Sequence, residues 1–158
     1  MKQRGVTLIQ MMCALAIAAL LTQLGMPAYT SWSDDLHRAA AARDLSQALR
    51  SARSHALLQG QPVLVQPLEN DWGKGWRVRL DSNQQLLREH RLARPVRIAS
   101  NTGEQVRFSA LGIPLRYTNN FQSATLEICD SQYHVVLAKT GRISLRTGER
   151  KAPLCAGY

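Results

Sequence analysis

The sequence predicts an α+β fold in which one long amino-terminal helix packs on a domain of antiparallel β-strands. Two observations predict the helix: residues 5–33 contain no charged or histidine side chain, and an amphipathic pattern with helical period follows them. A third observation predicts the sheet, because apolar and polar residues alternate in short segments beyond Pro62. The 158 residues leave room for one domain of ordinary size after the apolar run.

The apolar run is long enough to cross a bilayer as a helix. From Val6 to Met26 it would cover about 30 Å. We therefore expect a transmembrane helix over residues 6–28. A secretory signal peptide also has a basic start and an apolar stretch, but its cleavage site would follow that stretch. A plain membrane anchor would explain the hydropathy and nothing more.

The helix is expected to continue over residues 29–60 as an amphipathic segment. Apolar residues recur there at spacings of four, three and four: Leu45, Leu49, Ala52 and Ala56. Gly60 and Pro62 predict its end, since glycine favours a left-handed cap and proline cannot continue the helix. Gly25 and Pro27 predict a kink or a short melted turn within it.

Residues 61–158 are predicted to form an antiparallel β-sheet domain. The expected strands are Val63–Gln66, Gly75–Leu80, Gln85–His90, Val96–Ala99, Gln105–Ser109, Leu115–Thr118, Thr125–Cys129, Tyr133–Lys139 and Arg142–Thr147. The expected turns are Asp71–Gly75, Asp81–Asn83, Ser100–Gly103 and Asn119–Asn120.

The cysteines predict one disulfide. Because the basic amino terminus should remain cytoplasmic, the rest of the chain would face an oxidising compartment, where Cys129 and Cys155 can pair. Closing a loop of about 25 residues would stabilise the fold by about 3 to 4 kcal/mol. The alternative is two free thiols. Cys13 is expected to be a small buried side chain in the apolar helix.

The sequence gives no support for catalysis, a cofactor or a metal. The histidines are not spaced as metal ligands with one another or with a cysteine or carboxylate: His37, His55, His90 and His134. The chain contains no glycine-rich phosphate loop, nucleophile elbow or metalloprotease motif. We therefore expect a protein that is not an enzyme.

The charge of the chain is strongly basic and concentrates near the carboxyl terminus. The formal net charge is +9, and arginine predominates among the 20 basic residues, which favours forked contacts with phosphate or carboxylate. The terminal segment carries five cations against one acid, Glu149: Lys139, Arg142, Arg146, Arg150 and Lys151.

Strand alternation would place Arg142 and Arg146 on one face of the last strand, about 13 Å apart. Such a ridge suits contact with the phosphates of double-stranded DNA. There are two alternatives: the basic exterior keeps the domain soluble, or these cations pair with acids of a neighbouring subunit.

The amino terminus resembles the prepilin processing site of type IV pilins and type II secretion pseudopilins. The resemblance rests on the leader cations Lys2 and Arg4, Gly5, the continuation Thr7-Leu8-Ile9, and the helix-kinking Pro27. It implies that a prepilin peptidase cuts the 1–5 leader after Gly5 and that Val6 becomes the methylated amino terminus. The chain departs from the family at Val6, where Phe is usual, and at Gln10, where Glu is usual.

Further segments resemble the GspH/FimT branch of these families, as follows: Ala42-Arg43-Asp44-Leu45, Leu49–Ser54 with Ala56, Gly60–Val63, Gly75–Val78 and Thr140–Ile143. This branch implies a helix on a curved antiparallel sheet, a place as a minor subunit, and no catalytic activity. Some members are thought to bind DNA through Gly-Arg-x-Arg. Here the motif reads Gly141-Arg142-Ile143-Ser144, and Arg146 lies two residues further on.

The function expected from these resemblances is that of a minor type IV pilin, which primes assembly or lies at the pilus tip and binds DNA for uptake. The alternative is a type II secretion pseudopilin with a structural role. Other minor pilins or pseudopilins would be its partners. Before assembly the chain would cross the bacterial inner membrane once, with its domain in the periplasm.

Gln10 predicts a specialised place in the assembly. In the family, the glutamate at this position is thought to attract the methylated terminal amine of the adjacent subunit. An amide supplies no charge for that ion pair. We therefore expect the subunit at the end of the stack, in low copy number.

Overall fold

The computed structural model describes residues 8–102, 105–115, 123–148 and 152–157, without the side chains of residues 24–25 and 27–28. Two compact units divide the chain, Met1–Leu36 and His37–Tyr158, and each is described by itself.

Helix α1 runs from Leu8 to Gln59 without interruption, so the melted turn predicted at Gly25 and Pro27 is wrong. Proline removes one backbone donor from a long hydrogen-bonded ladder, and that loss has not ended the helix here. Within the first unit, large apolar side chains of α1 are exposed, among them Leu8, Ile9, Leu15 and Leu21. No helix in the described part of the chain has both the length and the apolarity needed to cross a membrane.

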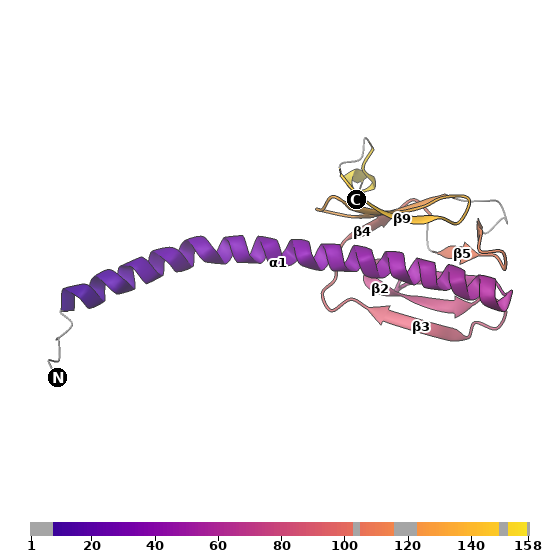
Figure 1. Cartoon of the computed structure of the whole chain (residues 1–158), viewed down its shortest axis with the longest axis horizontal. Coiled ribbons are helices and arrows are strands. Elements are labelled where there is room, and N and C mark those ends of the chain that lie inside the picture. Colours follow the sequence, from indigo (N-terminus) through magenta and orange to yellow (C-terminus); the bar gives the residue numbers. More distant parts are fainter. Residues whose placement is uncertain (1–7, 103–104, 116–122, 149–151, 158) are drawn as a thin grey trace. The chain divides into compact units, whose positions relative to one another are not determined.

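The described residues of the second unit form nine strands in two antiparallel sheets, at the positions the sequence predicts. Figure 1 shows these sheets beside α1. The five-stranded sheet has the order β3-β2-β1-β5-β6, with bounds Leu86–Arg91, Asp71–Leu80, Val63–Leu68, Val106–Phe108 and Pro114–Leu115. The four-stranded sheet has the order β4-β7-β8-β9, with bounds Ile98–Ser100, Ala124–Ile128, Tyr133–Leu137 and Ile143–Thr147. The strands thus divide between two sheets, whereas the resemblance implied one curved sheet.

The turn predicted at Asp71–Gly75 is wrong, because this segment is the first half of β2. The chain reverses at Glu69 and Asn70, which have φ angles of 52° and 60°. Gly73 and Gly75 serve close packing instead: a Cβ would lie 2.0 Å from the Val96 carbonyl oxygen at Gly73, and 2.1 Å from that of His90 at Gly75. These glycines therefore mark backbone contacts within the sheet domain.

The other predicted turns are found in part. Asp81–Asn83 is a turn, whereas Ser100 belongs to β4 and is followed by a bend at Asn101. Asn119–Asn120, Gly103 and residues 116–118 of the predicted sixth strand lie outside the described residues.

One apolar core joins α1 to both sheets. The predicted helix positions are all buried, and they belong to one cluster with side chains of both sheets: Leu45, Leu49, Ala52 and Ala56, with Val65, Trp76, Phe108, Leu126 and Val135. Polar contacts mark the two flanks of this helical segment. His90 Nε2 of β3 lies 3.6 Å from Asp44 Oδ2, and Arg50 Nη2 donates to the Ile143 carbonyl at the start of β9 over 3.4 Å.

The predicted disulfide between Cys129 and Cys155 is confirmed, with the two Cα atoms 5.6 Å apart. The backbone N–H of Leu154 donates to Glu127 Oε2 over 2.7 Å. The terminal 3-10 turn η1 (Leu154–Gly157) is therefore attached by a charge-assisted hydrogen bond to β7 and by a covalent bond to Cys129, the residue that follows β7. Cys13 is a free thiol that is exposed in the single chain, not buried.

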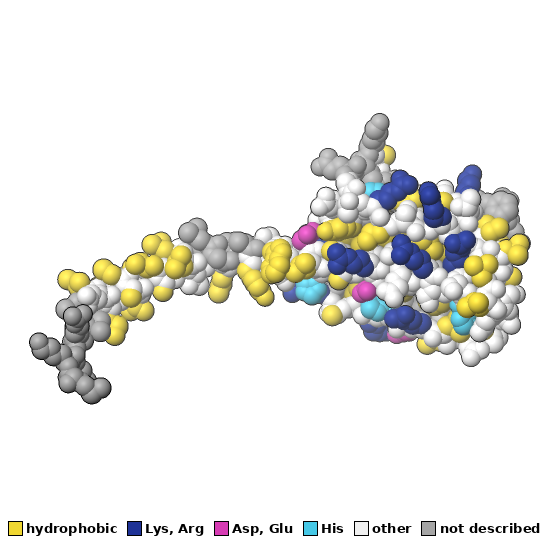
Figure 2. Space-filling view, viewed as in Figure 1, with side chains coloured by type: hydrophobic (Ala, Val, Ile, Leu, Met, Phe, Trp, Pro, Cys, Tyr) yellow, Lys and Arg dark blue, Asp and Glu magenta, His cyan; other side chains and the backbone are white. Residues whose placement is uncertain are grey.

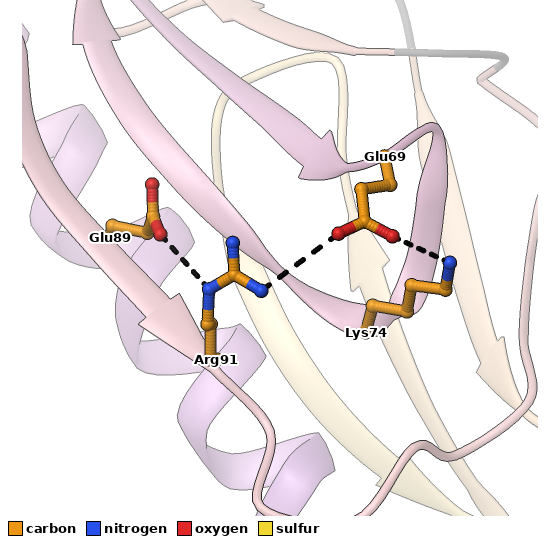
Figure 3. A network of polar contacts seen from close by, with 4 residues as sticks. All are labelled: Glu69, Lys74, Glu89 and Arg91. Carbon is orange, nitrogen blue, oxygen red and sulfur yellow. Dashed lines mark hydrogen bonds and ion pairs between the residues drawn. The ribbon is translucent and has the colours of Figure 1, made fainter.

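A polar network covers part of the five-stranded sheet on the face turned away from α1 (Figure 3). Lys74 Nζ lies 2.7 Å from Glu69 Oε2, and Arg91 contacts Glu69 and Glu89 at 3.9 and 3.3 Å. The hydrogen bond from Lys74 lowers the pKa of Glu69, and the same bond raises the pKa of Lys74. These exposed pairs add little stability, but they bring acids next to two of the cations of this face, Lys74 and Arg91.

Candidate nucleic-acid interface

The predicted basic ridge is carried by the hairpin of β8 and β9. The Ala138 N–H donates to the Arg142 carbonyl over 2.9 Å, and the Gly141 N–H donates to the Ala138 carbonyl over 2.8 Å. Gly141 has a φ of 83°, a conformation that glycine adopts without steric cost. Lys139 is exposed at the tip of this turn. The turn therefore fixes where β9 begins and where its first cation stands.

The turn is also packed tightly against its neighbours. A Cβ on Gly141 would lie 2.3 Å from the Gly112 carbonyl oxygen and 2.8 Å from Arg53 Nε. Arg53 Nε itself donates to that Gly112 carbonyl over 3.0 Å. The hairpin is thus held against α1 and against the loop before β6, in a space that only glycine fits.

Alternation along β9 places the arginines on the side away from the core. Ile143 is buried in the core cluster and Leu145 packs against it. Arg142, which directly precedes the strand, and Arg146 are exposed. Four residues of strand separate their Cα atoms by about 13 Å. The face division predicted from the sequence is therefore found in the structure.

The cations of this hairpin have no acidic partner among the described residues. Lys139, Arg142 and Arg146 form no ion pair there, and the sequence contains no acid between Asp130 and Glu149. Unpaired guanidinium groups with free N–H donors are suited to bind phosphate oxygens. Arg150 and Lys151 lie outside the described residues.

The structure places an additional arginine beside this ridge that the sequence analysis did not assign to it. Arg50 of α1 reaches the backbone of Ile143, 93 positions away in the chain. No local pattern could have indicated this proximity. Of the predicted processing and assembly residues, Gly5 and Val6 lie outside the described residues, whereas Gln10 and Pro27 lie within α1.

Comparison with protein families identifies the fold's relatives. Residues 41–141 match the family described as type II transport protein GspH. The chain belongs to the GspH family. The match covers the helix from Ala41, strands β1 to β8 and the hairpin turn as far as Gly141, and it ends before β9. No protein in the curated set matches the chain significantly in sequence.

Solved structures of pilus and pseudopilus subunits share the fold. The type IV minor pilin FimU of Pseudomonas aeruginosa superposes with a TM-score of 0.60 and 25% identity, covering 75% of this chain and 92% of that one. The minor pseudopilin EpsH of the Vibrio cholerae type II secretion system superposes with a TM-score of 0.56 and 14% identity, covering 74% of this chain and 99% of that one. The predicted α+β fold, a long helix packed on antiparallel strands, is thereby confirmed.

Gly141→Ala should displace the hairpin turn, because the new methyl group meets the Gly112 carbonyl and the backbone keeps a positive φ. We expect a loss of about 1 to 3 kcal/mol in the free energy of unfolding, measured by urea denaturation. Gly148→Ala is the matched control. It also has a positive φ, 118°, but no atom lies within 4 Å of its Cβ, so only the backbone cost remains. Equal losses in both variants would show that packing around Gly141 is unimportant.

Proposed function

We propose that this GspH-family chain is a minor pilin of a type IV pilus, which primes assembly or lies near the tip and binds double-stranded DNA for uptake. The binding residues are the cations of the β8–β9 hairpin, Lys139, Arg142 and Arg146, extended by Arg150 and Lys151. The chain has a structural and binding role and catalyses no reaction.

The unpaired cations on a fixed hairpin carry the DNA-binding part of this proposal. The Gly141 turn and the Arg53 contact hold the hairpin in place before any ligand arrives. Fewer degrees of freedom are then lost on binding. Phosphate contacts need regular positive charge and no base-reading groups, so this surface would bind DNA of any sequence.

The likeness to FimU supports a pilus, since that protein is a type IV minor pilin and 25% identical over 75% of this chain. The second candidate function is that of a type II secretion pseudopilin, which the family's description as a type II transport protein favours. In that case the basic hairpin would contact acids of neighbouring pseudopilins.

We place the chain in the bacterial inner membrane before assembly, with the domain in the periplasm. The charge-free run from Gly5 to Ser33 and the cations Lys2 and Arg4 support this orientation. The disulfide fits an oxidising compartment. The partners would be the prepilin peptidase and other minor pilins, which would cover the exposed apolar side chains of α1.

The DNA proposal is tested with the double variant Arg142→Gln, Arg146→Gln. The slope of log K against log salt is negative, and each lost phosphate contact reduces its magnitude by about 0.9, so the slope for duplex of unrelated sequences should become shallower by about 2. The measurement is a salt series of fluorescence anisotropy titrations, with the full chain in uncharged detergent.

The matched control for this test is Lys74→Gln, Arg91→Gln, which removes the same charge from the opposite face of the five-stranded sheet. It should leave the slope nearly unchanged. Duplex binding that the Arg142, Arg146 variant retains in full would refute the hairpin as the binding site.

Processing after Gly5 predicts a mature protein without residues 1–5. Intact mass spectrometry of the chain from its native membrane should show this loss together with one added methyl group. A mature pool that retains Met1 would refute the prepilin assignment.

Gln10→Glu tests the end position in the fibre. Restoring a carboxylate should allow the ion pair with a neighbouring terminal amine, so the variant should enter sheared pili in higher copy number, measured by quantitative immunoblotting. If the original protein is already abundant along the fibre and the variant is incorporated equally, the end position is wrong.

A further inference from the structure

A second row of cations lies on α1, beside the basic hairpin. Arg43 and Arg50 are both exposed and seven residues apart, which is close to two helical turns. They therefore lie on one face of the helix, about 10 Å apart. Neither forms an ion pair with a described residue.

The helical row is next to the row on β9. Arg50 Nη2 donates to the Ile143 carbonyl, which directly follows Arg142. This contact at 3.4 Å uses one of the five N–H donors of the guanidinium group, and it holds the group at the edge of β9. Arg53, one turn further on, is half-buried and supports the turn at Gly141.

The two rows form one basic face with a single acid. Between His37 and Gln59, α1 carries four arginines and only Asp44, which lies toward β3 at 3.6 Å from His90. Figure 2 shows Lys and Arg side chains gathered over this part of the domain, with few acidic ones among them. The face therefore has a strong positive potential.

The residues between the cations favour a nucleic acid over a protein. The exposed positions of α1 that lie within four residues of Arg43 or Arg50 are small or polar, namely Ala40, Gln47, Ser51 and Ser54, whereas the exposed Leu57 and Leu58 lie at the carboxyl end of the row and not at its centre. A protein interface usually has aromatic or large aliphatic side chains at its centre, whereas DNA interfaces are polar and positively charged.

We infer that Arg43 and Arg50 are part of the DNA-binding surface, and that the two rows bind the two phosphate backbones of a duplex. This inference rests on the proposed function. A duplex presents two chains of phosphates on either side of a groove about 6 or 12 Å wide, whereas a single strand presents one. Two adjacent rows of cations on rigid elements offer one row to each phosphate chain of a duplex. A single strand would contact one row and leave the other unused.

The test compares Arg43→Gln, Arg50→Gln with the original chain, both as full chains in uncharged detergent. Probes are a 30-base-pair duplex and a single strand of the same length. At 0.1 M salt, loss of two phosphate contacts corresponds to roughly 10- to 100-fold weaker duplex binding and a slope shallower by about 2. Single-strand binding should change much less, so the preference for duplex should fall. The control Lys74→Gln, Arg91→Gln should keep that preference.

The outcomes separate this inference from the proposed function. If only Arg142→Gln, Arg146→Gln weakens duplex binding, the helical row is not part of the site and the proposed function stands. If the original chain binds no duplex, both fail. Polyglutamate serves as a third probe, in place of an acidic protein. If Arg43→Gln, Arg50→Gln weakens binding to polyglutamate but not to DNA, the face serves an acidic protein partner. If Arg43→Gln, Arg50→Gln unfolds at a lower temperature than the original chain, Arg43→Gln alone gives the test. This single variant leaves the contact between Arg50 and Ile143 intact.

Discussion

The structure depends on the burial of one narrow face of α1 by two sheets at once. Leu45, Leu49, Ala52 and Ala56 are all buried in one cluster with side chains of both sheets. Because both sheets share these side chains, neither could bury its apolar face without the helix. The exposed remainder of α1 contributes nothing to the core, so its residues are free to serve binding.

Close contacts at Gly141 fix the position of the basic hairpin relative to α1. Gly141 lies against Gly112 of the loop before β6 and against Arg53 of α1, so three segments of the chain meet at one turn. Residue Arg142 follows directly and Ile143 enters the core. The orientation of the cations on β9 is therefore set by the same helix that organises the core.

Local periodicity predicted the helix and the positions of the described strands, because each depends on neighbouring residues. The disulfide was predicted from the compartment and from the small set of candidate cysteines. Periodicity did not predict that the strands divide into two sheets, since pairing order arises from contacts between distant segments. It also misplaced the β1–β2 turn: Gly73 and Gly75 are turn formers in general, but here they allow backbone contact within the sheet domain. The place of Arg50 beside β9 has the same long-range origin.

The distribution of paired and unpaired cations bears on why the chain is basic. On the outer face of the five-stranded sheet, Lys74 and Arg91 contact Glu69 and Glu89. A basic exterior that served solubility alone would need no region in which cations stand without acids, since scattered charges of both signs keep a domain soluble. Among the described residues, however, Arg43 and Arg50 of α1 and Arg142 and Arg146 of the hairpin form no ion pair and gather in one region, where their mutual repulsion costs stability. A cost of this kind is expected where an anionic partner offsets it on binding.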